Sequence, residues 1–262
     1  MTVQHVVMFS GGVGSWAAAK RVAAKHGTEN LTLLFADTSM EDEDLYRFID
    51  QAAANVGGTM IRLKEGRTPW EVFFDERFLG NSKVDPCSKI LKRQLSNNWR
   101  DTNLEPEHDR LYVGIDWTEE HRLTRLQKIA LPWRYEAPLC DPPYLTKREM
   151  IAALEAEGIR PPRLYAMGFP HNNCGGFCVK AGQANFKLLL DTMPERYRFH
   201  EQKEREIRAY LGKDVSIMTD RRGGKKKPLT MEAFRKGIQE QGTLFDKEEW
   251  GGFGCAIDGE GV

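Results

Sequence analysis

The sequence contains no long hydrophobic run and no excess of charge of either sign. No window approaches the roughly 18 to 20 consecutive apolar residues of a membrane-spanning helix. No charged segment precedes an apolar one at the N-terminus, as in a secretory signal. Lysine plus arginine (38) equal aspartate plus glutamate (38), which removes a global electrostatic argument for nucleic-acid binding. We therefore expect a cytoplasmic protein that does not enter membranes.

The chain also lacks an even set of cysteines. It has five in 262 residues, and a chain of this length can bury a core without disulfides. In an unexported protein, an odd number favours free thiols, metal binding or redox chemistry over structural disulfides. The cysteines are therefore the first candidates for chemistry.

Apolar runs alternate with helical periodicity in the N-terminal half. Residues 5–9 and 31–36 are typical of buried parallel strands, and 59–63 and 111–115 are two further strand candidates. Apolar residues between positions 45 and 56 recur on one face of a helix. This alternation predicts an α/β fold, with a parallel sheet wrapped by helices on both faces.

The C-terminal part is more helical. Thr146 and Glu149 predict a capping box at the start of a helix that Gly158 ends. A proline suits the first turn of a helix over 194–211, and a last helix is expected from about residue 231 to 241.

We expect two parts in the chain, a nucleotide-binding α/β domain over 1–180 and a helical extension over 181–262. The extension contains RRGGKKKP at 221–228, whose polar and glycine-rich composition predicts an exposed loop. Its five cations from Arg221 to Lys227 would suit the phosphates of tRNA or DNA. A solvated surface without a partner is the alternative.

The segment SGGVGS at 10–15 lies between the first predicted strand and a helix. Gly11, Gly12 and Gly14 let the backbone approach a ligand, and Ser10 and Ser15 add hydroxyl donors. A helix that begins here presents unsatisfied N–H groups and the positive end of its dipole. The segment is neither a Walker loop nor GxGxxG. It predicts a phosphate-binding loop, with an ordinary strand-to-helix turn as the alternative.

This loop and the segments that follow it resemble, in the same order, the PP-loop ATP pyrophosphatase superfamily and, within it, the phosphoadenosine phosphosulfate (PAPS) reductase family. SGGVGS matches the SGGxxS loop, and FADTSMEDEDLYRF, DPCSKILKRQL, VGIDWTEEHRLTR and HNNCGGFC follow at 35–48, 85–95, 113–125 and 171–178. The resemblance implies an adenine nucleotide alpha hydrolase-like fold and an adenosine nucleotide, ATP or adenylyl sulfate, bound over the loop. It also implies chemistry at the α-phosphate.

The same resemblance assigns residues to the nucleotide. Asp37 and Thr38, at the end of the second strand, line its pocket, and Asp37 assists catalysis with Mg²⁺. Lys92 could hold phosphate oxygens, although it could equally belong to a solvated helix face. Gly114 and Arg125 are placed at the nucleotide by the resemblance alone.

Cys174 and Cys178 enclose two glycines in a loop that could wrap a metal or a cluster. By resemblance, the site combines them with Cys87, takes a fourth ligand from Cys255 or Cys140, and holds a [4Fe-4S] cluster. The C-x3-C spacing suits zinc as well. Buried inert thiols are a third interpretation.

Cys255 has a second interpretation. It lies in GFGCAID, which faintly resembles the tail that carries the catalytic cysteine of sulfonucleotide reductases, with Gly254 and Asp258 in place of its glutamate and histidine. A thiolate there could attack the sulfur of a bound nucleotide, and a thioredoxin-like dithiol would then regenerate it.

The motifs together predict ATP-dependent adenylation coupled to sulfur or group transfer, with an iron–sulfur cluster. Reduction of adenylyl sulfate or phosphoadenylyl sulfate by Cys255 is the first alternative. The second is a non-catalytic, nucleotide-binding iron–sulfur subunit of a nucleic-acid modification complex. Val13 and Gly14 motivate it, because they replace the Asp or Lys usual in the loop.

Overall fold

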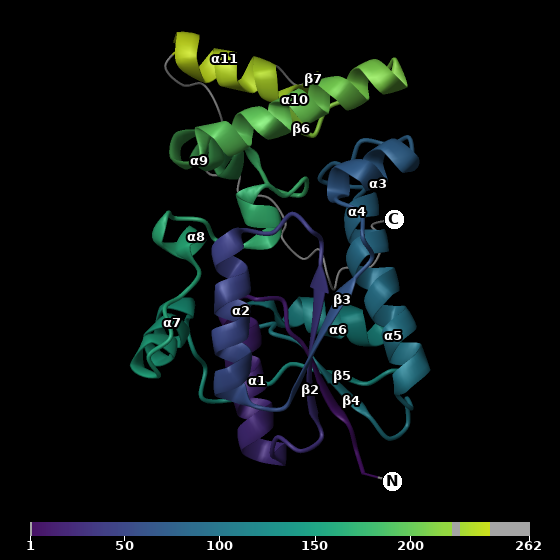
Figure 1. Cartoon of the computed structure of the whole chain (residues 1–262), viewed down its shortest axis with the longest axis vertical. Helices are drawn as coiled ribbons and strands as arrows, with labels where there is room; N and C mark the ends of the chain where they lie inside the picture. Colours follow the sequence, from purple (N-terminus) through teal and green to yellow (C-terminus); the bar gives the residue numbers. More distant parts are fainter. Residues whose placement is uncertain (1, 222–225, 242–262) are drawn as a thin grey trace.

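The computed structural model, which describes residues 2–221 and 226–241, is built around a five-stranded parallel sheet (Figure 1). Its strand order is β3-β2-β1-β4-β5. The strands are β1 (His5–Met8), β2 (Leu31–Asp37), β3 (Thr59–Lys64), β4 (Arg110–Tyr112) and β5 (Tyr135–Glu136). All four pairings are parallel, which confirms the predicted fold class.

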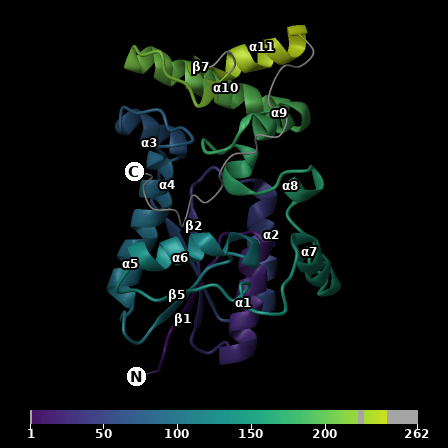
Figure 2. The same ribbon diagram turned by 180° about the vertical axis from the view of Figure 1, so that it is seen from behind.

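Helices cover both faces of this sheet (Figures 1 and 2). Helices α1 (Val13–His26) and α2 (Glu43–Val56) pack on one face, with α7 (Lys147–Ala156) outside α1. Helices α5 (Leu95–Asn103) and α6 (Glu120–Ile129) pack on the other face. Because the direction of the crossovers reverses between β1 and β4, the carboxyl ends of these two strands form the switch point where open α/β sheets bind ligands.

The helices that the sequence marks most clearly form where it predicts them. The apolar face of α2, from Leu45 to Val56, is buried, and its N-cap is Asp42, whose carboxylate accepts a hydrogen bond from the Asp44 N–H at 3.0 Å. The capping box of α7 forms between Thr146 and Glu149. Helix α10 (Pro194–Leu211) ends at a left-handed glycine.

A second hydrophobic core lies beyond the carboxyl ends of the strands, under the last helices (Figure 1). It joins Trp70 and Phe73 of the first half to Phe186, Tyr197 and Phe234 of the second. Its elements include α3 (Pro69–Asp75), α4 (Pro86–Ser88), the π-helical segment η1 (Lys89–Gln94), α9 (Gln183–Thr192), α10 and α11 (Met231–Gln241). Short helical turns η2 (Trp117–Glu119), α8 (Arg163–Ala166) and η3 (Asn173–Gly176) complete the described helices.

The structure differs from the sequence prediction around the basic segment. Strand β7 (Lys227–Leu229) pairs antiparallel with β6 (Met218–Asp220), so the predicted loop is wrong at residues 227 and 228. Pro228 is tolerated because a proline fits a strand at the edge of a small sheet. Residues 222–225 of the loop lie outside the described residues.

The predicted strand over 111–115 is shorter than expected, since β4 spans only Arg110–Tyr112. Beyond it, the chain packs against the start of α1 at Gly114. None of the helices in the described part of the chain is both long and apolar enough to cross a bilayer.

Candidate functional site

The N-terminus of α1 opens at the switch point of the sheet. Gly12 is its N-cap, so the N-cap residue has no side chain with which to cap the helix, and no acidic residue lies in its first turn. In contrast, α2 has an aspartate cap and two acids in its first turn. The positive dipole end of this 14-residue helix is therefore not neutralised by its own first turn and can attract an anion.

The glycines around this turn are required by close packing. Gly11 has a φ of 77°, and a Cβ there would lie 2.9 Å from Leu45 Cδ1. A Cβ on Gly114 would lie 2.7 Å from the backbone nitrogen of Ser15, and one on Gly14 would lie 3.1 Å from the Gly114 carbonyl oxygen. The structure thus places Gly114 directly against the predicted phosphate loop.

The two loop serines differ in their surroundings. The Ser15 hydroxyl is buried and donates to the Gly12 carbonyl oxygen at 2.8 Å. Ser10 is exposed beside Gly12. Ser10 is therefore the serine of the loop that a ligand can reach.

Tyr165 of α8 lies over the start of α1. Its hydroxyl oxygen accepts a hydrogen bond from the Val13 N–H at 3.3 Å, and burial raises the pKa of Tyr165 to about 12. The Lys147 ammonium lies 4.1 Å from the centre of the Tyr165 ring, and burial lowers the pKa of this lysine to about 8. Sequence reasoning missed this contact, because 152 positions separate Val13 from Tyr165.

Asp37 ends β2 with one carboxylate oxygen held in place. Its Oδ1 accepts hydrogen bonds from the Ser39 N–H at 2.8 Å and from the Tyr46 hydroxyl at 2.7 Å. No described residue donates to its Oδ2. Burial, followed by the hydrogen bond to Asp37, raises the pKa of Tyr46, so the tyrosine stays a donor.

Glu41 is a functional candidate that sequence reasoning missed. Its side chain is buried, and its carboxylate accepts hydrogen bonds from Thr38 Oγ1 at 3.0 Å, Lys92 Nζ at 3.3 Å and the Cys174 N–H at 2.6 Å. Thr38 and Lys92, both predicted to bind the nucleotide, therefore meet on one carboxylate. The only sequence signal was the acidic run that follows β2.

Three of the predicted ligand cysteines come together. Cys87, Cys174 and Cys178 line one small cavity with Thr38 and Lys92. Cys174 has a left-handed φ of 49° and is followed by a left-handed glycine, so the chain turns sharply around the cavity.

The other two predicted ligands are placed differently. Cys140 lies elsewhere, with its Sγ 3.7 Å from the Ile115 carbonyl oxygen on the α6 side of the sheet. Cys255 is outside the described residues.

The donor set of this cavity is that of a thiolate site. Three soft sulfur donors in one cavity suit an iron–sulfur cluster or zinc by their chemistry. Within residues 2–221 and 226–241, however, no group of three His, Cys, Asp or Glu side chains is arranged to hold a metal ion. The donor types therefore fit a thiolate-bound centre, whereas the described residues alone do not complete one.

Two loops of the site contain buried side chains whose polar atoms have no partner. Among the described residues, these are the hydroxyl of Ser39 and both amide atoms of Asn172. Asn172 is 5% exposed and lies beside the Tyr165 hydroxyl. Such groups are rare in native proteins and call for a ligand or water as their partner.

Arg125, which the family resemblance places at the nucleotide, is an exposed residue of α6.

Comparisons with known proteins give a distant likeness to solved structures. No family model matches the chain, and no curated protein matches it. Among solved structures, it is similar to the phosphoadenylyl-sulfate (PAPS) reductase from Candida auris in its phosphate complex. The TM-score is 0.45 and the identity 12%, over 64% of this chain and 80% of that chain.

Proposed function

We propose that this protein binds an adenosine nucleotide with its phosphates at the N-terminus of α1 and acts at the α-phosphate. The proposed reaction is ATP-dependent adenylation of an acceptor, coupled to sulfur or group transfer. One observation carries the proposal: a helix N-terminus whose N-cap is a glycine and whose first turn has no acid, preceded by a glycine turn, opens at the switch point of a parallel sheet. The order of the sequence motifs supports the choice of nucleotide.

The contacts of Tyr165 and Asn172 supply the phosphate recognition. A phosphate oxygen that accepts the Val13 N–H would also lie within reach of the Tyr165 hydroxyl, which can donate to it. The Asn172 amide, which approaches the Tyr165 hydroxyl but has no hydrogen-bond partner of good geometry among the described residues, would gain one. These donors would stabilise the negative charge that develops on the phosphate during attack.

Asp37 supports the use of Mg²⁺. Because Oδ1 is fixed by Ser39 and Tyr46, Oδ2 has a defined direction in which to meet a cation carried by the nucleotide. Carboxylate oxygens are the ligands that Mg²⁺ takes beside phosphates. The acceptor oxygen would attack the α-phosphorus, pyrophosphate would leave, and a sulfur or nitrogen nucleophile would then displace AMP.

Cys87, Cys174 and Cys178 would hold the implied cluster, with Cys255 as the proposed fourth ligand. A cluster there would bind a sulfur ligand or reaction partner close to the nucleotide. Iron and acid-labile sulfide analysis of anaerobically purified protein tests this, with Cys87→Ser as the variant and Cys140→Ser as its control outside the cavity. If the protein contains zinc and no iron, the site is a zinc site and not a cluster. If it contains neither metal, the three cysteines are inert thiols.

The function is tested by titrating the anaerobic protein with Mg-ATP, adenylyl sulfate and phosphoadenylyl sulfate. Tight binding of ATP with weak binding of the sulfonucleotides supports adenylation. The reverse preference would support the reductase alternative, in which Cys255→Ser abolishes turnover without loss of iron. Nucleotide binding without turnover by the purified chain would support the non-catalytic subunit.

Asn172→Leu separates recognition from structure. Because the amide atoms have no hydrogen-bond partner of good geometry among the described residues and approach only the Tyr165 hydroxyl, this variant should lose less than about 1 kcal/mol of stability, while its affinity for Mg-ATP falls about fivefold or more. Ser10→Ala with Gly12→Ala should lose nucleotide binding as well. Unchanged affinity in both variants would remove the phosphate site from the N-terminus of α1.

A further inference from the structure

A basic cavity of about 440 Å³ lies where three distant segments of the chain meet. Its described lining contains the cations Arg77, Lys83, Lys213, Arg221, Lys226 and Lys227, with Asp214 as the only acid among them. Sequence analysis had identified only the cations near the β6–β7 hairpin. The fold adds Arg77 and Lys83 from the segment after α3, and Lys213 from the end of α10.

Two more cavities follow from this one, each sharing a lining residue with the one before it. A cavity of about 510 Å³ shares Phe78 and Lys83 with the first and adds Lys89 and Arg93 of η1. A third, of about 270 Å³, shares Arg93 with the second and adds Arg100. The shared residues place the three cavities next to one another, and we call their combined lining the basic track.

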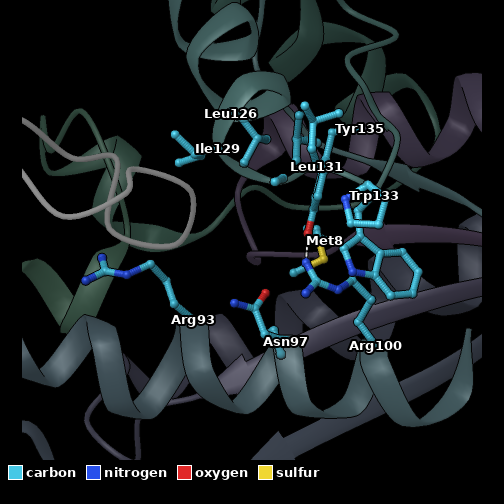
Figure 3. A pocket seen from close by; sticks show the side chains of 13 residues that line it. Met8, Arg93, Asn97, Arg100, Leu126, Ile129, Leu131, Trp133 and Tyr135 are labelled. Carbon is cyan, nitrogen blue, oxygen red and sulfur yellow. Dashed lines mark hydrogen bonds between the residues drawn. The ribbon is translucent and has the colours of Figure 1, made fainter. Parts of the chain in front are cut away.

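The third cavity brings the basic track to the candidate site. Figure 3 shows Arg93, Asn97 and Arg100 along one helical segment, with Arg100 extending toward Trp133 and Tyr135 and Arg93 pointing away from these two rings. Met8, at the end of β1, and Val113, after β4, also line this cavity, so it reaches the switch point of the sheet. Val113 directly precedes Gly114, which packs against the phosphate loop.

The charge of the basic track contrasts with that of the whole chain. The described lining of the three cavities contains nine lysines and arginines against three acids, whereas the full sequence has no net charge. Two of the acids already form ion pairs: Asp85 with Arg93, and Asp214 with Arg208. Because the cations follow one another along the track instead of converging on a point, they suit an extended polyanion better than a single phosphate.

Exposed aromatic rings lie beside the cations, and such rings can stack with the bases of a single strand. Phe78 is 40% exposed where the first two cavities meet, and Tyr210 is 50% exposed with the Arg77 guanidinium 5.3 Å from its ring centre. An unpaired base can unstack from its neighbours and stack on a ring or enter a cavity, whereas a paired base must first be flipped out of the duplex at a cost of a few kcal/mol.

We propose that the basic track binds a single-stranded segment of nucleic acid, with its backbone running from the β6–β7 hairpin to the carboxyl edge of the sheet. The binding itself follows from the track alone. That the bound strand is the acceptor of the adenylation rests on the proposed function.

Fluorescence anisotropy with labelled oligonucleotides of about 12 nucleotides tests the proposal. The full chain is titrated with single-stranded RNA, single-stranded DNA and a duplex of the same sequence, at several salt concentrations. We expect a single strand to bind more tightly than the duplex, and the RNA and DNA arms identify the sugar that is preferred. Duplex binding equal to or tighter than both single strands would overturn the proposal.

A matched pair of variants tests the location. Lys83→Gln, Lys213→Gln and Lys227→Gln together should weaken single-strand binding about tenfold or more and reduce the slope of log K against log salt by about 2. The control removes the same number of charges from exposed residues outside the track, on α1, α6 and α7, with Lys25→Gln, Lys128→Gln and Arg148→Gln. Equal loss of binding in the two triple variants would refute the track.

Two further measurements separate the ring contact and the nucleotide site. Phe78→Leu, which keeps an apolar side chain but removes the ring, should weaken single-strand binding about fivefold or more. The track variant should bind Mg-ATP as the wild type does. A chain that binds single strands through the track but does not bind ATP would overturn the proposed function and leave the basic track standing.

Discussion

Replacing the buried carboxylate of Glu41 should lower the free energy of unfolding more than breaking an exposed ion pair would. The Glu41 side chain is 2% exposed and the Lys92 side chain 12% exposed, and their charged atoms lie 3.3 Å apart. In Glu41→Gln, the amide keeps the shape but leaves the Lys92 ammonium without this carboxylate. Breaking a buried pair costs about 3 to 5 kcal/mol. Since the remaining carbonyl oxygen can still accept one hydrogen bond, we expect about 3 kcal/mol.

The assay is urea unfolding followed by tryptophan fluorescence, in a double-mutant cycle with Lys92→Met. Because the two side chains contact each other, the double variant should be about 1 to 3 kcal/mol more stable than the sum of the single effects predicts. The matched control is Glu157→Gln, which breaks an ion pair with Lys20 whose side chains are 36% and 34% exposed. That control should lose less than about 1 kcal/mol.

Two results would refute this reasoning. If Glu41→Gln unfolds with the same free energy as the wild type, the carboxylate does not hold its three donors in solution. If the cycle is additive within about 0.5 kcal/mol, Glu41 and Lys92 do not form the pair.

Three further changes test other parts of the structure. Gly114→Ala should cost about 1 to 3 kcal/mol and weaken Mg-ATP binding, because its Cβ would lie 2.7 Å from the Ser15 nitrogen; thermal unfolding and nucleotide titration measure the two effects. Burial lowers the pKa of Lys147 to about 8 from 10.5, so the unfolded state binds more protons between these values and stability should rise with pH across them. Lys147→Met should abolish that rise in urea unfolding at pH values on either side. The buried Glu204 carboxylate accepts hydrogen bonds from two backbone N–H groups, at 3.0 and 2.6 Å, and Glu204→Ala should cost about 2 to 5 kcal/mol; a stability loss in Glu204→Gln as large as in the alanine variant would contradict the role of these bonds.

The elements with a local signal could be predicted from the sequence, and those set by distant contacts could not. The glycine turn, the amphipathic face of α2 and the capping box of α7 each depend on residues within about four turns of one another. Strands β5, β6 and β7 have only two or three residues each, too few for an alternating pattern. They form because neighbouring strands or tertiary packing supply their partners.

The same distinction holds within the candidate site. The phosphate loop is contiguous, so its residues could be named from the sequence. Glu41 and Asn172 could not, because their significance depends on which backbone and side-chain groups the fold places beside them. The gathering of Cys87 with Cys174 and Cys178 was expected from family resemblance alone, since spacing carries no information over such a separation.

The second core also has a consequence for biosynthesis. It packs Trp70 and Phe73 of α3 against rings as late in the chain as Phe234 of α11. At roughly 5 to 20 residues per second, the ribosome needs about 8 to 30 seconds to extend the nascent chain from α3 to α11. During that interval the rings of α3 cannot be covered by their final partners. Early binding by a chaperone at α3, released once α11 has emerged, would protect the nascent chain from aggregation.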